Sequence, residues 1–177
     1  MQKPIDLFPT ESGTDRLSKP RLSLSEYNEV ARRHVSHIDE VKQALQHICL
    51  PFQGQGSILP IRCVEAAHTL DTLRNRVEQF CKQLEETSRL PLALLSLRYE
   101  LFDLCYQIID RADKLEVRIT MFRRASQSPA RSSIRKEIHA TLQHMSQLIS
   151  DLARQVEDHS EAARFQERQL TGSTKRH

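Results

Sequence analysis

Glycine and tryptophan are scarce in this sequence, which has four glycines and no tryptophan among its 177 residues. Turn-rich β-sandwiches and nucleotide-binding folds with glycine-rich loops need glycine for their tight turns, so the composition disfavours both classes. Long apolar runs are lacking as well. The longest nearly continuous run covers residues 90–97 and ends at Arg98, whereas a membrane-spanning helix needs about 20 apolar residues. We therefore expect no membrane span.

Sequence motifs of enzymes and metal sites are also lacking. There is no glycine-rich phosphate loop, no nucleophile elbow and no paired metal-binding motif. We therefore expect a protein that is not an enzyme and that holds neither a cofactor nor a metal.

The cysteines and the first residues bear on the compartment. The four cysteines have no CxxC spacing and are too sparse for a disulfide scaffold; they are Cys49, Cys63, Cys81 and Cys105. The first twenty residues contain neither the apolar stretch nor the cleavage pattern of a secretory leader. We expect reduced, mostly buried thiols and a cytoplasmic protein, with the nucleus as the alternative location.

The charge balance is nearly even, with 26 basic and 23 acidic residues and a net charge of +3. This surplus is too small for a protein that coats nucleic acid. Because 38% of the residues are hydrophobic, the composition also excludes a wholly disordered chain.

What the sequence does contain is heptad periodicity. The first periodic segment starts with a capping box, in which Ser23 caps a backbone amide and Glu26 reaches back to Ser23. From there, seam residues recur at alternating intervals of four and three, which is typical of a helix that packs lengthwise on another; they are Tyr27, Ala31, His34, Ile38, Val41, Leu45 and Ile48.

Three further segments show the same spacing. The second segment runs through Cys63, Ala66, Leu70, Leu73, Val77, Phe80 and Leu84. The third runs through Leu94, Leu101, Ile108, Leu115 and Phe122. The fourth runs through Ile134, Ile138, Thr141, Met145, Leu148, Leu152 and Val156. Prolines separate the segments, and Ser128-Pro129 is a suitable start for the fourth helix. The sequence therefore predicts an all-α fold, an elongated antiparallel helical bundle or folded coiled coil of about four long helices.

The domain boundaries follow from where the periodicity begins and ends. We predict a flexible N-terminal tail over residues 1–22, a helical bundle domain over residues 23–167, and a flexible C-terminal tail over residues 168–177.

The third segment has apolar residues on both sides of its seam, which indicates either the most buried helix or a helix with two partners. We therefore predict a partner-binding surface on it, formed by Leu94, Leu97, Leu101, Leu104 and Ile108.

Six basic residues and no acidic residue occur between positions 118 and 136. We call these six residues the basic tip: Arg118, Arg123, Arg124, Arg131, Arg135 and Lys136. They could bind phosphates or an acidic partner, or they could be a solvated turn beside a helix C-terminus. In the same turn, Ser126 and Ser128 match short patterns that kinases accept, and a phosphate there would add about two negative charges to a basic cluster.

Two histidine-containing patterns are weaker. Glu65 and His68 match the Glu-x-x-His element of di-iron bundles, but the sequence has no second copy. His34 and His37 are three residues apart and could reach one metal ion, yet a seam histidine usually has a structural role. We expect structural roles for both pairs, and pH sensitivity if His34 is buried.

These observations lead to two hypotheses. The first is a non-catalytic helical-bundle adaptor, or a subunit of a multiprotein assembly, that binds partner helices through its apolar seams as a homo- or hetero-oligomer. The alternative is a protein that binds nucleic acid or an anionic surface through the basic tip.

Overall fold

The structure, a computed structural model, describes residues 24–54, 57–86, 95–125 and 129–173. It contains four α-helices, α1 (Leu24–Cys49), α2 (Pro60–Glu86), α3 (Leu95–Arg124) and α4 (Pro129–Ser173), and a short 3-10 helix η1 (Leu50–Phe52). No strand occurs in these ranges. The predicted all-α helical bundle is therefore confirmed, while the coiled-coil geometry stays a prediction.

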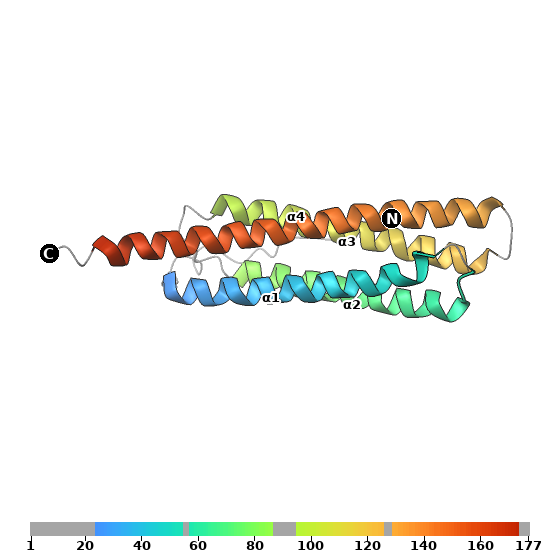
Figure 1. Cartoon of the computed structure of the whole chain (residues 1–177), viewed down its shortest axis with the longest axis horizontal. Coiled ribbons are helices and arrows are strands. Elements are labelled where there is room, and N and C mark those ends of the chain that lie inside the picture. The colour runs from blue at the N-terminus through green and yellow to red at the C-terminus, as the bar shows by residue number, and fades with distance from the viewer. Residues whose placement is uncertain (1–23, 55–56, 87–94, 126–128, 174–177) are drawn as a thin grey trace, which may run out of the picture.

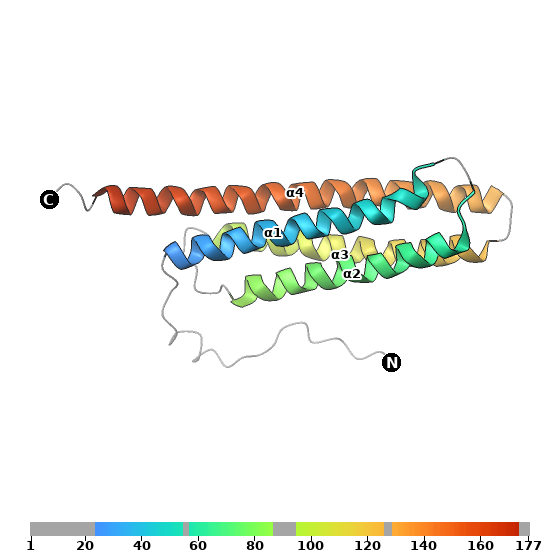
Figure 2. The same cartoon turned by 60° about the horizontal axis from the view of Figure 1, so that its bottom comes forward.

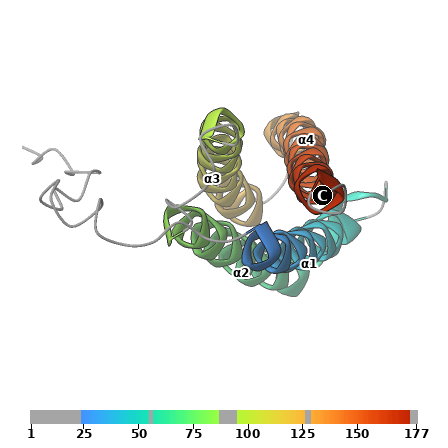
Figure 3. The ribbon, with the colours of Figure 1, turned by 90° about the vertical axis from the view of Figure 1, so that its left-hand side faces the viewer.

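The four helices lie side by side as an elongated bundle, and each runs antiparallel to the next one in the chain (Figures 1 and 2). α1 packs against α2 and α4, and α3 packs against the same two helices. The view along the bundle shows this ring of four (Figure 3). Short connections between long helices favour this up-and-down topology.

The core consists of the heptad seams that the sequence predicts. The inner faces are lined by buried residues such as Ile38 and Val41 on α1, Leu73 on α2, Ile108 on α3 and Leu152 on α4. A helical repeat of 3.6 residues places positions three and four apart on one face, so each seam turns towards the bundle axis. The four helices bury these seams against one another within a single chain.

The 3-10 helix η1 closes one end of this core. Phe52 is completely buried, and its ring meets that of Phe122 edge-on at a centroid distance of 6.2 Å. This aromatic contact joins the segment after α1 to the last turn of α3. The end of α1, the start of α2, the end of α3 and the start of α4 all meet there, and we call this the closed end of the bundle (Figure 1).

The long fourth helix differs from the sequence expectation. The boundary predicted between residues 167 and 168 lies inside α4, which continues to Ser173. No proline interrupts residues 130–173, so no residue blocks the helical hydrogen bonds there. α4 has 45 residues, against 26 in α1, and it extends past the first turn of α1 (Figure 2).

Some sequence predictions lie outside the described residues. These are the tail over residues 1–22, the cap at Ser23, and the start of the third seam at Leu94. Among the described helices, none combines the length and the apolar character that crossing a membrane requires.

Candidate interaction surface

The partner surface predicted on the third helix is largely part of the core. Leu101 and Ile108 have exposed fractions of 1% and 0%, and Leu104 is half-buried against the same core. Leu94 lies outside the described residues, and the side chain of Leu97 is not described. The prediction is therefore corrected for Leu101 and Ile108: α2 and α4 already cover them, so neither is free to contact a partner.

Half of the basic tip has partners within the bundle. Arg118 on α3 donates to the Glu137 carboxylate on α4 at 3.2 Å, which joins the two helices. Arg131 donates to the carbonyl oxygens of Ala125 and Ile58, both at 3.4 Å. Its guanidinium carbon also lies 4.5 Å from the centroid of the Phe122 ring.

Arg135 adds a further contact of the same kind, since its guanidinium donates to the carbonyl oxygen of Gly54. Arg131 and Arg135 therefore hold the segment between α1 and α2 against the start of α4. Carbonyl groups outside helices need donors, and these two arginines supply them. Their role is structural, which the sequence could not reveal because the bonded residues lie 73 and 81 positions away.

The other half of the basic tip is exposed. Arg123, Arg124 and Lys136 have no ion pair or hydrogen bond with any residue that the structure describes. Ser126 and Ser128 lie outside the described residues. The closed end of the bundle thus carries three cations that an external group could approach.

Exposed apolar side chains gather at the same end. The described residues include nine large hydrophobic side chains that are exposed, and six of them belong to the closed end. We call these six the end patch: Leu50, Leu59, Ile61, Val64, Val117 and Met121. Their exposed fractions lie between 45% and 61%. Sequence reasoning missed them because they lie off the seams, although Val117 and Met121, spaced i and i+4, share one helix face.

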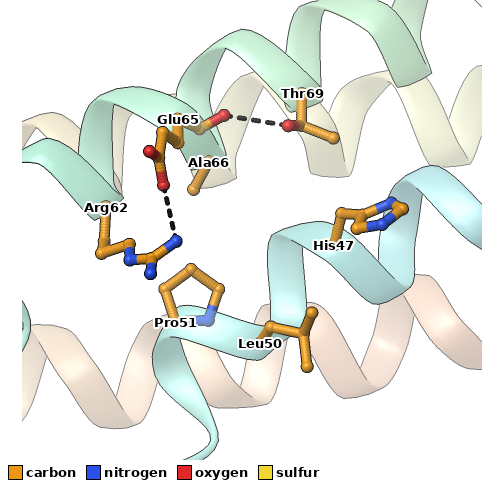
Figure 4. Close-up of a pocket in the computed structure, with 7 residues that line it drawn as sticks. All are labelled: His47, Leu50, Pro51, Arg62, Glu65, Ala66 and Thr69. Carbon is orange, nitrogen blue, oxygen red and sulfur yellow. Dashed lines mark hydrogen bonds and ion pairs between the residues drawn. The ribbon is translucent and has the colours of Figure 1, made fainter.

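A cavity of about 460 Å³ adjoins the end patch between the end of α1 and the start of α2 (Figure 4). Arg62 and Glu65 point towards each other across one side of it, and their charged groups are 3.0 Å apart. Thr69 donates its hydroxyl to the backbone carbonyl of Glu65 at 2.9 Å. Leu50 is the one residue of the end patch that also lines this cavity.

The ion pair with Arg62 also gives Glu65 a structural partner. His68, the other member of the Glu-x-x-His pattern, is exposed, and its backbone carbonyl accepts a hydrogen bond from the Thr72 hydroxyl at 3.2 Å. Within the described ranges, no three histidine, cysteine or acidic side chains come together in a way that could hold a metal ion.

His34 is buried inside the bundle, as its seam position predicts. Its ring meets that of Phe80 on α2 edge-on at a centroid distance of 5.1 Å, and its Nε2 has no hydrogen-bond partner among the described residues. Burial, together with the nearby charges of His37 and Arg33, lowers the pKa of His34 to about 4. His34 is therefore a neutral core residue, and it adds no polar group to the end patch.

Comparison of the chain with protein-family models, with curated proteins and with solved structures gives no match. The function is therefore inferred from the surface itself, which combines six exposed apolar side chains with three cations that have no partner among the described residues.

Proposed function

We propose that this chain is a non-catalytic helical-bundle adaptor or assembly subunit that binds an acidic amphipathic helix of a partner protein at its closed end. The observation that carries this proposal is that six of the nine exposed large hydrophobic side chains that the structure describes lie at that end. Isolated exposed apolar residues are common on proteins, but clusters of them mark interaction sites.

The apolar part of the surface would supply most of the binding free energy. Each side chain of the end patch is about half exposed, and covering the exposed half is worth roughly 1 kcal/mol at about 25 cal/mol per Å². An amphipathic helix presents its apolar residues at intervals of three and four. Such a helix could contact Ile61 and Val64, which lie three residues apart on α2.

The charges favour an acidic partner over a neutral one. The acidic groups of this region already have basic partners, since Glu65 pairs with Arg62 and Glu137 pairs with Arg118. Arg123, Arg124 and Lys136 remain as a positive surplus near the closed end of the bundle. Complementary charges at the edge of an apolar contact raise the association rate and select among partners.

The test uses a synthetic helical peptide with a leucine face and glutamate flanks, labelled with fluorescein, and the same peptide with lysine in place of each glutamate. Binding to the full chain is followed by fluorescence anisotropy. We expect tighter binding of the glutamate peptide, and a Kd that rises about tenfold or more in the double variant Ile61→Ser/Val64→Ser, which corresponds to about 1.4 kcal/mol.

The matched control is the double variant Tyr99→Ser/Tyr106→Ser, which removes two exposed apolar side chains from the other half of α3. This variant should bind the glutamate peptide as the wild type does. Equal affinity for the two peptides, or an equal loss in both variants, would contradict the proposal. Light scattering on the protein alone would show whether a second copy occupies the end patch instead.

The alternative function, binding to nucleic acid or another anionic surface, is supported by the exposed side chains of Arg123, Arg124 and Lys136. It makes a different prediction for a labelled single-stranded oligonucleotide. Binding would weaken steeply with salt and would depend on Arg123 and Arg124 but not on Ile61 and Val64. We favour the adaptor because Arg118, Arg131 and Arg135 already have partners inside the bundle.

A further inference from the structure

Two cysteines from neighbouring helices face each other across the core. Cys81 on α2 and Cys105 on α3 both belong to the hydrophobic core, and their thiols are close enough for each to shift the pKa of the other. Cys105 is completely buried, whereas Cys81 is at the edge of the core with an exposed fraction of 9%. Both thiols are free in this structure.

Contacts between α2 and α3 on either side of the two cysteines support this proximity. Arg74 on α2 contacts Asp113 and Glu116 on α3 at 2.9 and 2.7 Å, and Arg98 on α3 donates to the backbone carbonyl of Glu85 on α2 at 3.5 Å. These neighbouring helices run antiparallel (Figures 2 and 3). The stretch of α2 between two such contacts therefore lies opposite the stretch of α3 between the same contacts. Cys81 lies between Arg74 and Glu85 on α2, and Cys105 lies between Arg98 and Asp113 on α3. The contacts on either side therefore bracket the two thiols on facing stretches of the helices.

The two thiols differ in reactivity. The hydrogen bond from Cys105 lowers the pKa of the Cys81 thiol, whereas the same bond, together with burial, raises the pKa of Cys105 well above its usual value. The thiolate is the reactive form of cysteine, and Cys81 is also the more exposed of the two side chains, so Cys81 is the thiol that reacts first. Burial raises the pKa of both Cys49 and Cys63, which makes them less reactive.

We propose that Cys81 and Cys105 form a reversible disulfide that cross-links α2 to α3 when the protein meets a small-molecule disulfide such as oxidised glutathione. This modification site is independent of the adaptor function and uses no residue of the end patch.

The exchange takes place in two steps. The Cys81 thiolate, after losing its proton to solvent, attacks one sulfur of the oxidant, which forms a mixed disulfide and releases one glutathione thiolate. Cys105 then loses its proton, and its sulfur attacks Sγ of Cys81, which releases the second glutathione. The two cysteines lose two electrons and two protons in total, and the oxidant leaves as two molecules of reduced glutathione.

The test equilibrates the reduced full chain in glutathione mixtures of increasing oxidising power. Acid quenching, alkylation with iodoacetamide, trypsin digestion and mass spectrometry then report each cysteine. Trypsin cleaves after Arg76, Lys82, Arg98 and Arg111, so the two thiols fall in different peptides. We expect a linked pair of the peptides 77–82 and 99–111, which dithiothreitol separates again, while Cys49 and Cys63 stay alkylated.

Variants separate the role of Cys81, which attacks the oxidant, from that of Cys105, which closes the disulfide. In Cys105→Ala the reaction should stop at a glutathione adduct on Cys81, whereas Cys63→Ala, which removes another buried thiol, should form the cross-link as the wild type does. The oxidised wild type should melt at a temperature roughly 5–10 °C higher, because the cross-link restricts the unfolded chain. Full alkylation of Cys81 and Cys105 in the most oxidising mixture, a linkage that involves Cys49 or Cys63, or an unchanged melting temperature would overturn the proposal.

Discussion

Protonation of the buried His34 should destabilise the bundle at mildly acidic pH. His34 has an exposed fraction of 2%, and its pKa falls from 6.5 in the unfolded chain to about 4 in the fold. Burial is the main cause, and the charges of His37 and Arg33 on the same helix act in the same direction. From α2, the uncharged ring of Phe80 packs against the imidazole, while Arg76 lowers the pKa of His37.

The sign and the size follow from proton linkage. Between pH 6.5 and pH 4 the unfolded chain binds the proton and the folded chain does not. The contribution of His34 is therefore fully present above pH 6.5, decreases as the pH falls, and is lost below pH 4. At about 1.4 kcal/mol per pKa unit, the total loss is about 3 kcal/mol.

The assay compares urea unfolding of the wild type and His34→Leu by circular dichroism across this pH range. The carboxylates titrate in both proteins, so their contributions cancel when the free energy of unfolding of the wild type is subtracted from that of the variant. We expect the free energy of unfolding of the variant to gain about 3 kcal/mol relative to the wild type between neutral pH and pH 4. Because burial also lowers the pKa of the less buried His37, His37→Gln should give a smaller gain. An identical pH dependence in the wild type and His34→Leu would mean that the folded and unfolded chains bind the His34 proton equally well.

Two further predictions concern the closed end and the core. Arg131→Gln should lower the free energy of unfolding by about 1–2 kcal/mol, because it removes the contact with the Phe122 ring and the bonds to two backbone carbonyls. In thermal melts, the control variant Arg123→Gln should match the wild type. Equal losses of stability in the two variants would contradict a structural role for Arg131. Leu101→Ala should lower the free energy of unfolding by about 2–5 kcal/mol because it leaves a cavity in the core. Val117→Ala, on the exposed face of α3, should change it by no more than about 0.5 kcal/mol. Similar losses for the two variants in urea titrations would show that the inner and outer faces of α3 are wrongly assigned.

The inner faces of the helices could be predicted because they depend only on local spacing. A residue such as Leu101 lies three or four positions from its seam neighbours, and the helical repeat places it on the same side as they are. The sequence could not show which helix covers that side. Leu101 and Ile108 satisfied the pattern of a partner-binding seam equally well, but α2 and α4 of the same chain bury them.

The candidate surface depended on contacts between distant residues, which local patterns do not contain. Arg131 and Lys136 are indistinguishable as members of a basic cluster. Only the fold brings Ile58 next to Arg131 and leaves Lys136 without a partner among the described residues. In the same way, the exposed residues Ile61 and Val117 are far apart in the sequence and reach the same end of the bundle only because α2 and α3 are antiparallel.

The most direct test of the proposed binding surface is a nuclear magnetic resonance titration of the isotopically labelled full chain with the glutamate peptide. We expect the changes in backbone amide chemical shift to concentrate in residues 50–64 and 117–124, with little change near Tyr99 and Tyr106. Shifts centred on Tyr99 and Tyr106, or no shifts at peptide concentrations at which anisotropy detects binding, would contradict the claim that the closed end of the bundle is the partner-binding site.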